Sequence, residues 1–345
     1  MAHHRLVLIG NGFDLAHGLR TSYKDFVSSH VCYSFDRFLN DGHYSDPLVN
    51  FEKNSRPIEG DLPSQKNLHQ VLEFCETNRL IKYPSSFYQR LVELCDRGWV
   101  DIERQYYNTL KALFRNNNLG NEKSKLIGQL NADFDHIIDL LTTYITIINS
   151  RLKQSKRLPI EDSRLSFFKG VRNEKDGPVT FLNFNYTETL SEHDYADPAE
   201  IIHIHGRAAD VSNNPIIFGY GDETDPTYQQ IEDAGENTYL EHIKSFGYFK
   251  TNNYQKLLQL ISSNTYTVYI VGHSCGLSDR VLLSEIFEHS NCLGIEIFFH
   301  RRADGSDNYK EITQEISRHF SPQNKRKMRS LITPYNEENA IPQNR

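Results

Sequence analysis

Hydrophobic residues recur along this chain with two different periods. Continuous aliphatic and aromatic runs, bounded by polar or glycine-containing segments, predict strands at residues 6–9, 179–182, 201–204, 215–218, 265–271 and 293–299. Runs that are apolar on both faces are typical of buried parallel strands. Helical spacing follows several of them, for example at Leu277, Val281, Leu282 and Ile286. This alternation predicts an α/β fold with a Rossmann-like, mostly parallel sheet flanked by helices.

Apolar positions between residues 21 and 175 follow a different pattern. They recur at spacings of three and four over 99–113 and 134–148, which predicts amphipathic helices, and strand-like runs are nearly absent. We therefore expect a discontinuous nucleotide-binding core, residues 1–20 and 176–335. A large all-helical insertion after the first strand, residues 21–175, splits this core, and a polar tail, residues 336–345, follows it.

The composition is that of a folded protein in a reducing compartment. Of the 345 residues, 38% are hydrophobic and 12% are aromatic, which is enough for a substantial core. The five cysteines are scattered and include no C-x-x-C pair, which disfavours a disulfide framework and a zinc ribbon. Apolar runs at 6–10 and 137–148 are too short for a signal peptide or a membrane span. We expect a cytoplasmic protein without a membrane segment.

Charge is distributed unevenly along the chain. The formal net charge of −7 argues against a broad nucleic-acid-binding surface, which needs a basic face. However, residues 151–175 carry eight basic and three acidic side chains, whereas residues 221–241 carry seven acidic and no basic ones. The acidic stretch is interpreted as a solvated loop or helix face. The basic stretch is either such a solvated face or a segment that faces phosphate groups.

The first candidate motif follows the first predicted strand. Gly10 and Gly12 come directly after it, and glycine there lets backbone N–H groups approach a phosphate at the start of a helix. The usual dinucleotide fingerprint has a third glycine where this chain has Leu15. The motif is therefore either a nucleotide-binding turn or a tight strand–helix turn without a ligand.

Two further motifs end later strands. Asn183 and Asn185 alternate along one strand, so their side chains share a face and can bind ribose hydroxyls or cap the next helix. His203 and His205 likewise share a face, and Gly206 follows them. A histidine at this position is a good general base, although a structural role or a metal-binding pair is the alternative. No acid-rich partner motif accompanies the pair, so we expect no metal.

A fourth motif has the G-x-S-x-G pattern of a nucleophile elbow. It runs from Gly272 to Gly276, with Ser274 at the nucleophile position. Only about 70 residues follow it, too few for the rest of a usual α/β-hydrolase sheet. The alternative is a polar turn at a helix start, in which Ser274 and Ser278 face a phosphate or ribose and Asp279 is a favourable first-turn charge.

Taken together, these motifs resemble the AbiH family of bacterial abortive-infection proteins, which act against bacteriophage. The resemblance covers roughly residues 5–300, and GNGFDLAHGLRTSYKDF and GHSCGLSD are its most specific parts. The segments WVDIE, LNADFD, FNYT and HIHG lie between them in the same order. The resemblance implies antiphage defence that is switched on by a phage-derived trigger or a defence-system partner protein, and assembly into a homo-oligomer.

AbiH proteins are in turn similar to the sirtuin-like superfamily of NAD-binding proteins. The glycine spacing of the first motif, Asn185-Tyr186, His205-Gly206 and Gly272-His273-Ser274 carry that similarity. Arg20 and Thr187 depart from the superfamily pattern, and the zinc-binding cysteine pairs of deacetylases are absent. The similarity implies NAD as a substrate or ligand, with hydrolysis of the nicotinamide–ribose bond.

In that interpretation Asn185 holds the ribose or positions the water, and His205 is the base. The other expected ligand-binding residues are Gly10, Asn11, Gly12, Phe13, Asp14, Asn183, Tyr186, Gly206, Gly272, His273, Ser274, Ser278 and Asp279. Three alternatives stay open: a non-catalytic sensor of NAD or ADP-ribose, an effector that acts on nucleic acid, and a serine hydrolase that uses the GHSCG motif.

Overall fold

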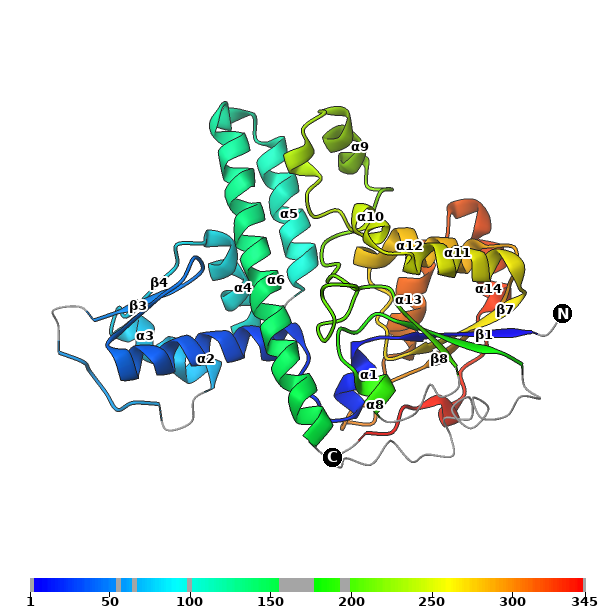
Figure 1. Cartoon of the computed structure of the whole chain (residues 1–345), viewed down its shortest axis with the longest axis horizontal. Coiled ribbons are helices and arrows are strands. Elements are labelled where there is room, and N and C mark those ends of the chain that lie inside the picture. The colour runs from blue at the N-terminus through cyan, green and yellow to red at the C-terminus, as the bar shows by residue number, and fades with distance from the viewer. Residues whose placement is uncertain are drawn as a thin grey trace. The chain divides into compact units, whose positions relative to one another are not determined.

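A computed structural model describes residues 3–53, 57–63, 67–97, 101–154, 177–192 and 199–343 of the chain. The described residues belong to two compact units (Figure 1). The first, the α/β unit, lies within Met1–Thr21, Thr142–Asp233 and His242–Arg345. The second, the helical unit, lies within Ser22–Leu141 and Ala234–Glu241.

A five-stranded parallel sheet forms the centre of the α/β unit. Its strands are β1 (His4–Ile9), β5 (Val179–Asn183), β6 (Glu200–His203), β7 (Tyr266–Val271) and β8 (Cys292–Phe298). Their order in the sheet is β6-β5-β1-β7-β8, and every neighbouring pair is parallel. The chain thus builds outward from β1 in one direction and then in the other, which is the Rossmann-like arrangement. The predicted fold class is confirmed.

One predicted strand is wrong. Residues 215–218 form a loop, in which the Ile217 N–H donates to the carbonyl of His205 at 2.9 Å. Ile217 and Phe218 are buried, so the apolar run reflects the packing of this loop rather than strand pairing. Pro215 also lacks the N–H that a central strand position would use. The other five predicted strands are present with shifts of one or two residues at their ends.

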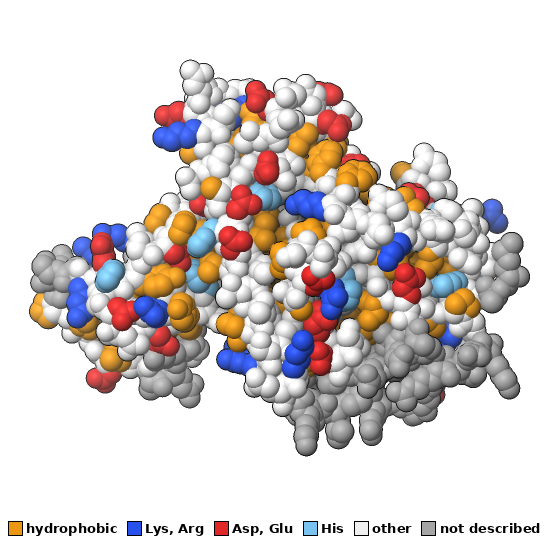
Figure 2. Space-filling view, viewed as in Figure 1, with side chains coloured by type: hydrophobic (Ala, Val, Ile, Leu, Met, Phe, Trp, Pro, Cys, Tyr) orange, Lys and Arg blue, Asp and Glu red, His pale blue; other side chains and the backbone are white. Residues whose placement is uncertain are grey.

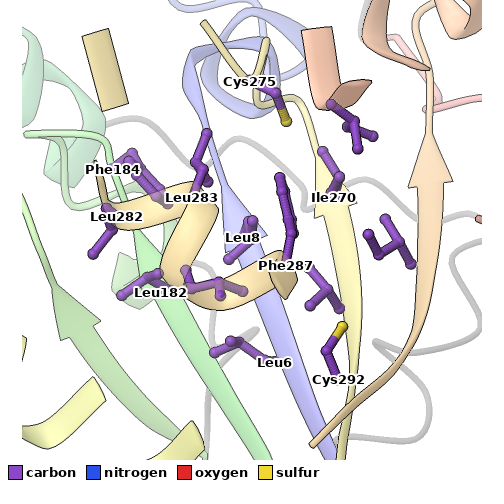
Figure 3. Close-up of a cluster of buried hydrophobic side chains, with 14 of the residues drawn as sticks. Leu6, Leu8, Leu182, Phe184, Ile270, Cys275, Leu282, Leu283, Phe287 and Cys292 are labelled. Carbon is purple, nitrogen blue, oxygen red and sulfur yellow. The ribbon is translucent and has the colours of Figure 1, made fainter. Parts of the chain in front are cut away.

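Both faces of the sheet are covered, as parallel strands require. On one face Leu6 and Leu8 pack in a core of aliphatic and aromatic side chains that includes Phe287 (Figure 3). Four described helices contribute to this core: α11 (Asn253–Ser263), α12 (Arg280–Glu288), α13 (Tyr309–His319) and, through Leu331, α14 (Lys325–Leu331).

The opposite face has a smaller core around Val7 and Ile9. Two short helices cover it, α1 (Asn11–Ala16) and α8 (Thr189–Glu192), through side chains such as Phe13. Among the described residues, the α/β unit also contains α9 (Pro226–Asp233), α10 (Lys244–Gly247) and the last part of α6 (Glu122–Gln154).

The helical unit is built mainly from α2 (Tyr23–Asp41), α3 (Leu68–Thr77), α4 (Ser86–Asp96), α5 (Ile102–Arg115) and the first part of α6 (Glu122–Gln154). Side chains of Ser22, Asn67, Ser85 and Asp101 accept backbone N–H bonds at the starts of four of these helices, which explains where they begin.

This unit also contains a small antiparallel sheet that the periodicity did not predict. Its strands are β2 (His43–Ser45), β3 (Asn50–Glu52) and β4 (Ile81–Lys82). Strands of two or three residues are too short to show an alternating pattern, so the expected all-helical segment is helical with this addition.

The turns after β1 and β7 pack backbone against backbone. The Gly12 N–H donates to the carbonyl of Gly272 at 2.8 Å, and the Gly10 N–H donates to that of Val271 at 3.1 Å. A Cβ atom added to Gly12 would lie 2.8 Å from Gly272 Cα. Glycine is therefore required at both positions by close approach of the two turns.

Replacing Gly272 with alanine tests this packing. Gly272 has a φ of +70°, and its added Cβ would lie 2.2 Å from the Phe13 nitrogen. We expect a loss of at least about 3 kcal/mol in the free energy of unfolding, from left-handed strain plus the displaced turn. Gly305→Ala is the matched control, because Gly305 has a φ of +85° with nothing within 4 Å. It should cost only about 1 kcal/mol in the same denaturant titration, and equal losses would contradict the packing argument.

Candidate functional site

Polar side chains from the turns after β5, β6 and β7 gather at the carboxyl edge of the sheet, where ligands bind in open α/β folds. Asn185 follows β5, His205 follows β6, and His273 follows β7. Each is less than 10% exposed. The ring of Phe184 lies between the two histidines, 5.0 Å from that of His205 and 4.1 Å from that of His273.

The asparagines of the second motif order the turn after β5. Asn183 accepts the Asn185 N–H with its side-chain oxygen at 3.0 Å. Asn185 in turn donates its Nδ2 to the carbonyl of Gly10 at 3.0 Å, so this turn is joined to the one after β1. Asn183 also approaches the Nδ1 of His203 at 3.4 Å. Both asparagine side chains are therefore engaged with the backbone of these turns.

An aromatic environment surrounds the ring of His205. Tyr186 and Tyr248 lie roughly parallel to it, with ring centroids at 6.3 and 6.5 Å. Burial, and next the charge of Lys244, lower the pKa of His205 to about 4, although Asp279 acts in the opposite direction. The imidazole is therefore neutral at pH 7, and it becomes an effective general base only where its pKa rises toward 7, a change that the carboxylate of Asp279 favours.

Asp279 is the central charge of the site. Its Oδ1 accepts from Lys244 Nζ at 2.7 Å and lies 3.1 Å from His205 Nε2, and its Oδ2 lies 3.6 Å from His273 Nε2. Burial alone would raise the pKa of Asp279, but Lys244 and His205 outweigh it and hold that pKa well below its usual range. His205 Nε2 meets Asp279 at ion-pair distance without hydrogen-bond alignment. The contact between them is therefore electrostatic.

The sequence motifs did not identify Lys244 or Tyr248 as site residues. Lys244 is only 2% exposed, a rare burial for lysine unless it is paired. It lies in α10, and the next turn, η4 (Tyr248–Lys250), carries Tyr248. Neither residue belongs to a recognisable spacing, because only the tertiary fold brings α10 to the ends of β6 and β7.

The GHSCG segment does not have the geometry of a nucleophile elbow. The strained residue, with a φ of +54°, is Cys275 and not Ser274. Cys275 is completely buried, and burial raises its pKa far above that of a free thiol. His319 binds its carbonyl oxygen through Nε2 at 2.8 Å, and His273 Nδ1 accepts its N–H at 3.0 Å. Ser274 is exposed and no described histidine is bonded to it.

The glycine-rich turn has little free capacity for an anion. Besides the Gly10 and Gly12 bonds to the β7 turn, the Phe13 N–H donates to the carbonyl of Gly10 at 2.9 Å. The N–H groups expected to face a diphosphate are therefore engaged with carbonyl oxygens of the chain. The side chain of Asn11 accepts a bond from Thr21 at 2.6 Å, which ties the turn to the segment before α2.

The other expected ligand-binding residues support the surrounding turns. Tyr186 donates its hydroxyl to the carbonyl of Ile217 at 3.3 Å. Gly206 has a φ of +87°, and a Cβ there would collide with the backbone of Pro215. Ser278 is half-buried, and a Cβ atom added to Gly221 would lie 2.9 Å from its carbonyl oxygen.

Asp14 forms a second buried polar group, in the first turn of α1. Its Oδ2 accepts from the hydroxyl of Thr187 at 2.7 Å, and Thr189 donates to Thr187 at 3.2 Å. The other oxygen, Oδ1, is buried and without a hydrogen-bond partner. Burial raises the pKa of Asp14 to about 6, against weaker opposing hydrogen bonds from Thr189, Thr187 and Asn185.

Within the described ranges, no group of three or more histidine, cysteine or acidic side chains is arranged to hold a metal ion. None of the described helices combines the length and the apolar character needed to cross a membrane. Most of the basic stretch 151–175 lies outside the described residues.

The α/β unit is thus a Rossmann-like unit with a buried lysine–aspartate–histidine cluster at the carboxyl edge of its sheet. Over residues 6–301 the chain matches the family described as "Bacteriophage abortive infection AbiH". The chain belongs to this family, and its role is accordingly in bacteriophage abortive infection. The resemblance to AbiH proteins expected from the motifs is confirmed. A search of curated proteins found no match.

The buried pair of Lys244 and Asp279 should show strong energetic coupling. We expect Lys244→Met and Asp279→Asn each to cost about 3–5 kcal/mol, since either leaves a buried charge without its main partner. The double variant should cost at least about 2 kcal/mol less than the sum. Denaturant unfolding of all four proteins measures this coupling. The same cycle on the exposed pair Arg37 and Asp41 is the control and should couple by less than about 1 kcal/mol; equal coupling in both cycles would contradict burial as the cause.

Asp14→Asn should change how stability depends on pH. A folded-state pKa of about 6, above the ordinary 3.8, means that the folded protein binds this proton more tightly than the unfolded chain. Its stabilising contribution is present below pH 3.8 and is lost as pH rises through about 6. Because asparagine stays neutral, the variant should gain up to about 3 kcal/mol relative to wild type between pH 4 and 7. Denaturant titrations across that range test this, and a constant difference would contradict it.

Proposed function

We propose that this chain is an abortive-infection effector that hydrolyses NAD at the nicotinamide–ribose bond. The observation that carries the proposal is the neutral His205 beside the ionised Asp279, at the edge of the sheet where Asn185 also lies. A neutral base, a carboxylate that stabilises its protonated form and an amide are the groups that hydrolysis of an N-glycosidic bond needs.

In the proposed reaction, nicotinamide leaves with the electron pair of its bond to ribose C1′, and the ribose develops oxocarbenium character. A water molecule adds to C1′ and gives its proton to the imidazole of His205. The carboxylate of Asp279 stabilises the imidazolium. Nδ2 of Asn185 is engaged with Gly10, so we assign its Oδ1 to a ribose hydroxyl. The products are nicotinamide, ADP-ribose and one proton.

The ribose end of the site supports this substrate better than the diphosphate end does. The N–H groups of Gly10, Gly12 and Phe13 are already bonded to carbonyl oxygens, so the proposal assigns them no diphosphate contact. The N–H groups of Gly10 and Gly12 instead hold the turn after β1 against the turn of His273. Because these N–H groups are already bonded, we keep a second candidate function: a sensor that binds ribose-containing ligands without turnover.

The proposal for nucleic acid has less support from the described surface. On the face of the α/β unit drawn in Figure 2, the described lysine and arginine side chains lie singly or beside acidic ones rather than in a continuous basic area. Two such pairs are Arg207 with Glu188 and Arg280 with Asp222. Paired side chains of this kind are poor phosphate ligands, because their charge is already balanced.

Purified protein incubated with NAD, with and without lysate from phage-infected cells, should release nicotinamide. We expect His205→Ala and Asn185→Ala each to lower the rate at least about 100-fold, since each removes a group used in the transition state. Both should also abolish protection in a phage plating assay. Chromatography of nicotinamide and ADP-ribose gives the rates.

His300→Ala and Asn117→Ala, which truncate exposed side chains of the same types, are the controls and should retain the wild-type rate. If no nicotinamide is released under either condition, the hydrolase proposal is wrong. Tight calorimetric binding of ADP-ribose without release would then support the sensor.

A further inference from the structure

The turns that carry Asn185 and His205 are joined by one bidentate ion pair. Glu188, three residues after Asn185, accepts from Arg207, two residues after His205. The Arg207 Nε donates to Oε1 at 3.0 Å, and Nη2 donates to Oε2 at 2.6 Å. Two parallel bonds from a planar guanidinium fix both distance and orientation, which a single contact cannot do.

Burial makes this pair different from an ordinary surface ion pair. The side chain of Glu188 is 5% exposed and that of Arg207 is 30% exposed. Backbone bonds between the same turns accompany it: the Ala208 N–H donates to the carbonyl of Tyr186 at 3.2 Å. The ion pair is thus the side-chain part of a short connection between the two turns.

A third partner comes from the last part of α6, the part that belongs to the α/β unit. The side-chain oxygen of Asn149 accepts the Glu188 N–H at 3.0 Å, and this bond is buried. Five residues earlier, Tyr144 donates its hydroxyl to the carbonyl of Arg20 at 2.6 Å, just after the glycine-rich motif. The same helix therefore contacts the segment between α1 and α2 and the turn that follows β5.

We propose that Glu188 is a positioning residue that, held by Arg207 and Asn149, sets the placement of Asn185 relative to His205. The expected effect of Glu188 on kcat rests on the proposed function, but its expected effect on the two turns does not. The side-chain bonds of Glu188 go to Arg207, so it acts through the turns that carry Asn185 and His205.

Loss of the pair has a specific physical consequence. In Glu188→Gln, the guanidinium of Arg207 loses a carboxylate that accepts two bonds and gains an amide whose single oxygen is neutral. The two turns are then held less firmly and can move apart. A small displacement of His205 from the ribose that Asn185 holds costs about 10- to 100-fold in rate, while Asn185 keeps its own contact with that ribose. The expected signature is therefore a lower kcat with KM changed less than about threefold.

The test combines kinetics, hydrogen exchange and a double variant. Glu188→Gln and Arg207→Gln should each raise amide exchange about tenfold or more in residues 184–188 and 205–208, and not in β1 or β7. The double variant Glu188→Gln/Arg207→Gln leaves no unpaired buried charge and allows an amide–amide bond, so it should recover part of the kcat. Arg207→Lys, which keeps the charge and loses the fork, should fall between wild type and Arg207→Gln.

Glu311→Gln breaks an exposed ion pair with Arg302 in the same unit and is the matched control. It should leave exchange, kcat and phage protection unchanged. If Glu188→Gln lowers the melting temperature but leaves exchange in both turns and kcat unchanged, Glu188 is only structural and the inference is overturned.

The outcomes also separate this inference from the proposed function. Wild-type protein that releases no nicotinamide refutes the hydrolase, while local exchange and phage plating still decide the role of Glu188. Conversely, an active wild type with unaltered exchange in Glu188→Gln refutes the positioning role alone.

Discussion

A carboxylate taken out of water must be compensated, and the burial of Asp279 imposes that requirement on the whole carboxyl edge of the sheet. Lys244 compensates the carboxylate directly by an ion pair, although this buries the charge of Lys244 as well. His205 and His273 also lie beside the carboxylate. Because these partners come from the turns after β6 and β7 and from α10, the cluster can form only when the sheet order is complete. Stability and the electrostatics of the site therefore depend on the same contacts.

A second constraint is the close packing of the glycine-containing turns after β1 and β7. Gly12 and Gly272 approach more closely than any side chain would allow, and the Gly12 N–H donates to the Gly272 carbonyl. Glycines of this kind are commonly associated with phosphate, but here the described geometry uses them for backbone contact. The polar side chains available to a ligand then lie toward β5 and β6, with Asn185 and His205.

Much of the fold followed from local patterns. Five parallel strands and the helical segment were predicted because continuous apolar runs and i, i+3, i+4 spacing survive in any tertiary context. The loop at 215–218 was wrongly predicted as a strand, since burial alone produces the same apolar run. Asn185 and His205 were predicted to lie at one edge of the sheet because each follows a strand at its carboxyl end, and the structure places both there. The membership in the AbiH family was likewise visible from motif order.

What the sequence by itself determined is therefore the identity and order of elements that carry their signal locally: strands, helix caps and residues at strand ends. Tertiary structure alone decided which distant groups share a site. Lys244, Tyr248 and the pairing of Glu188 with Arg207 carry no local signal, because a charge partner is selected by distance in space and not by spacing along the chain. The same reason explains the glycine turns, whose role depends on what packs against them.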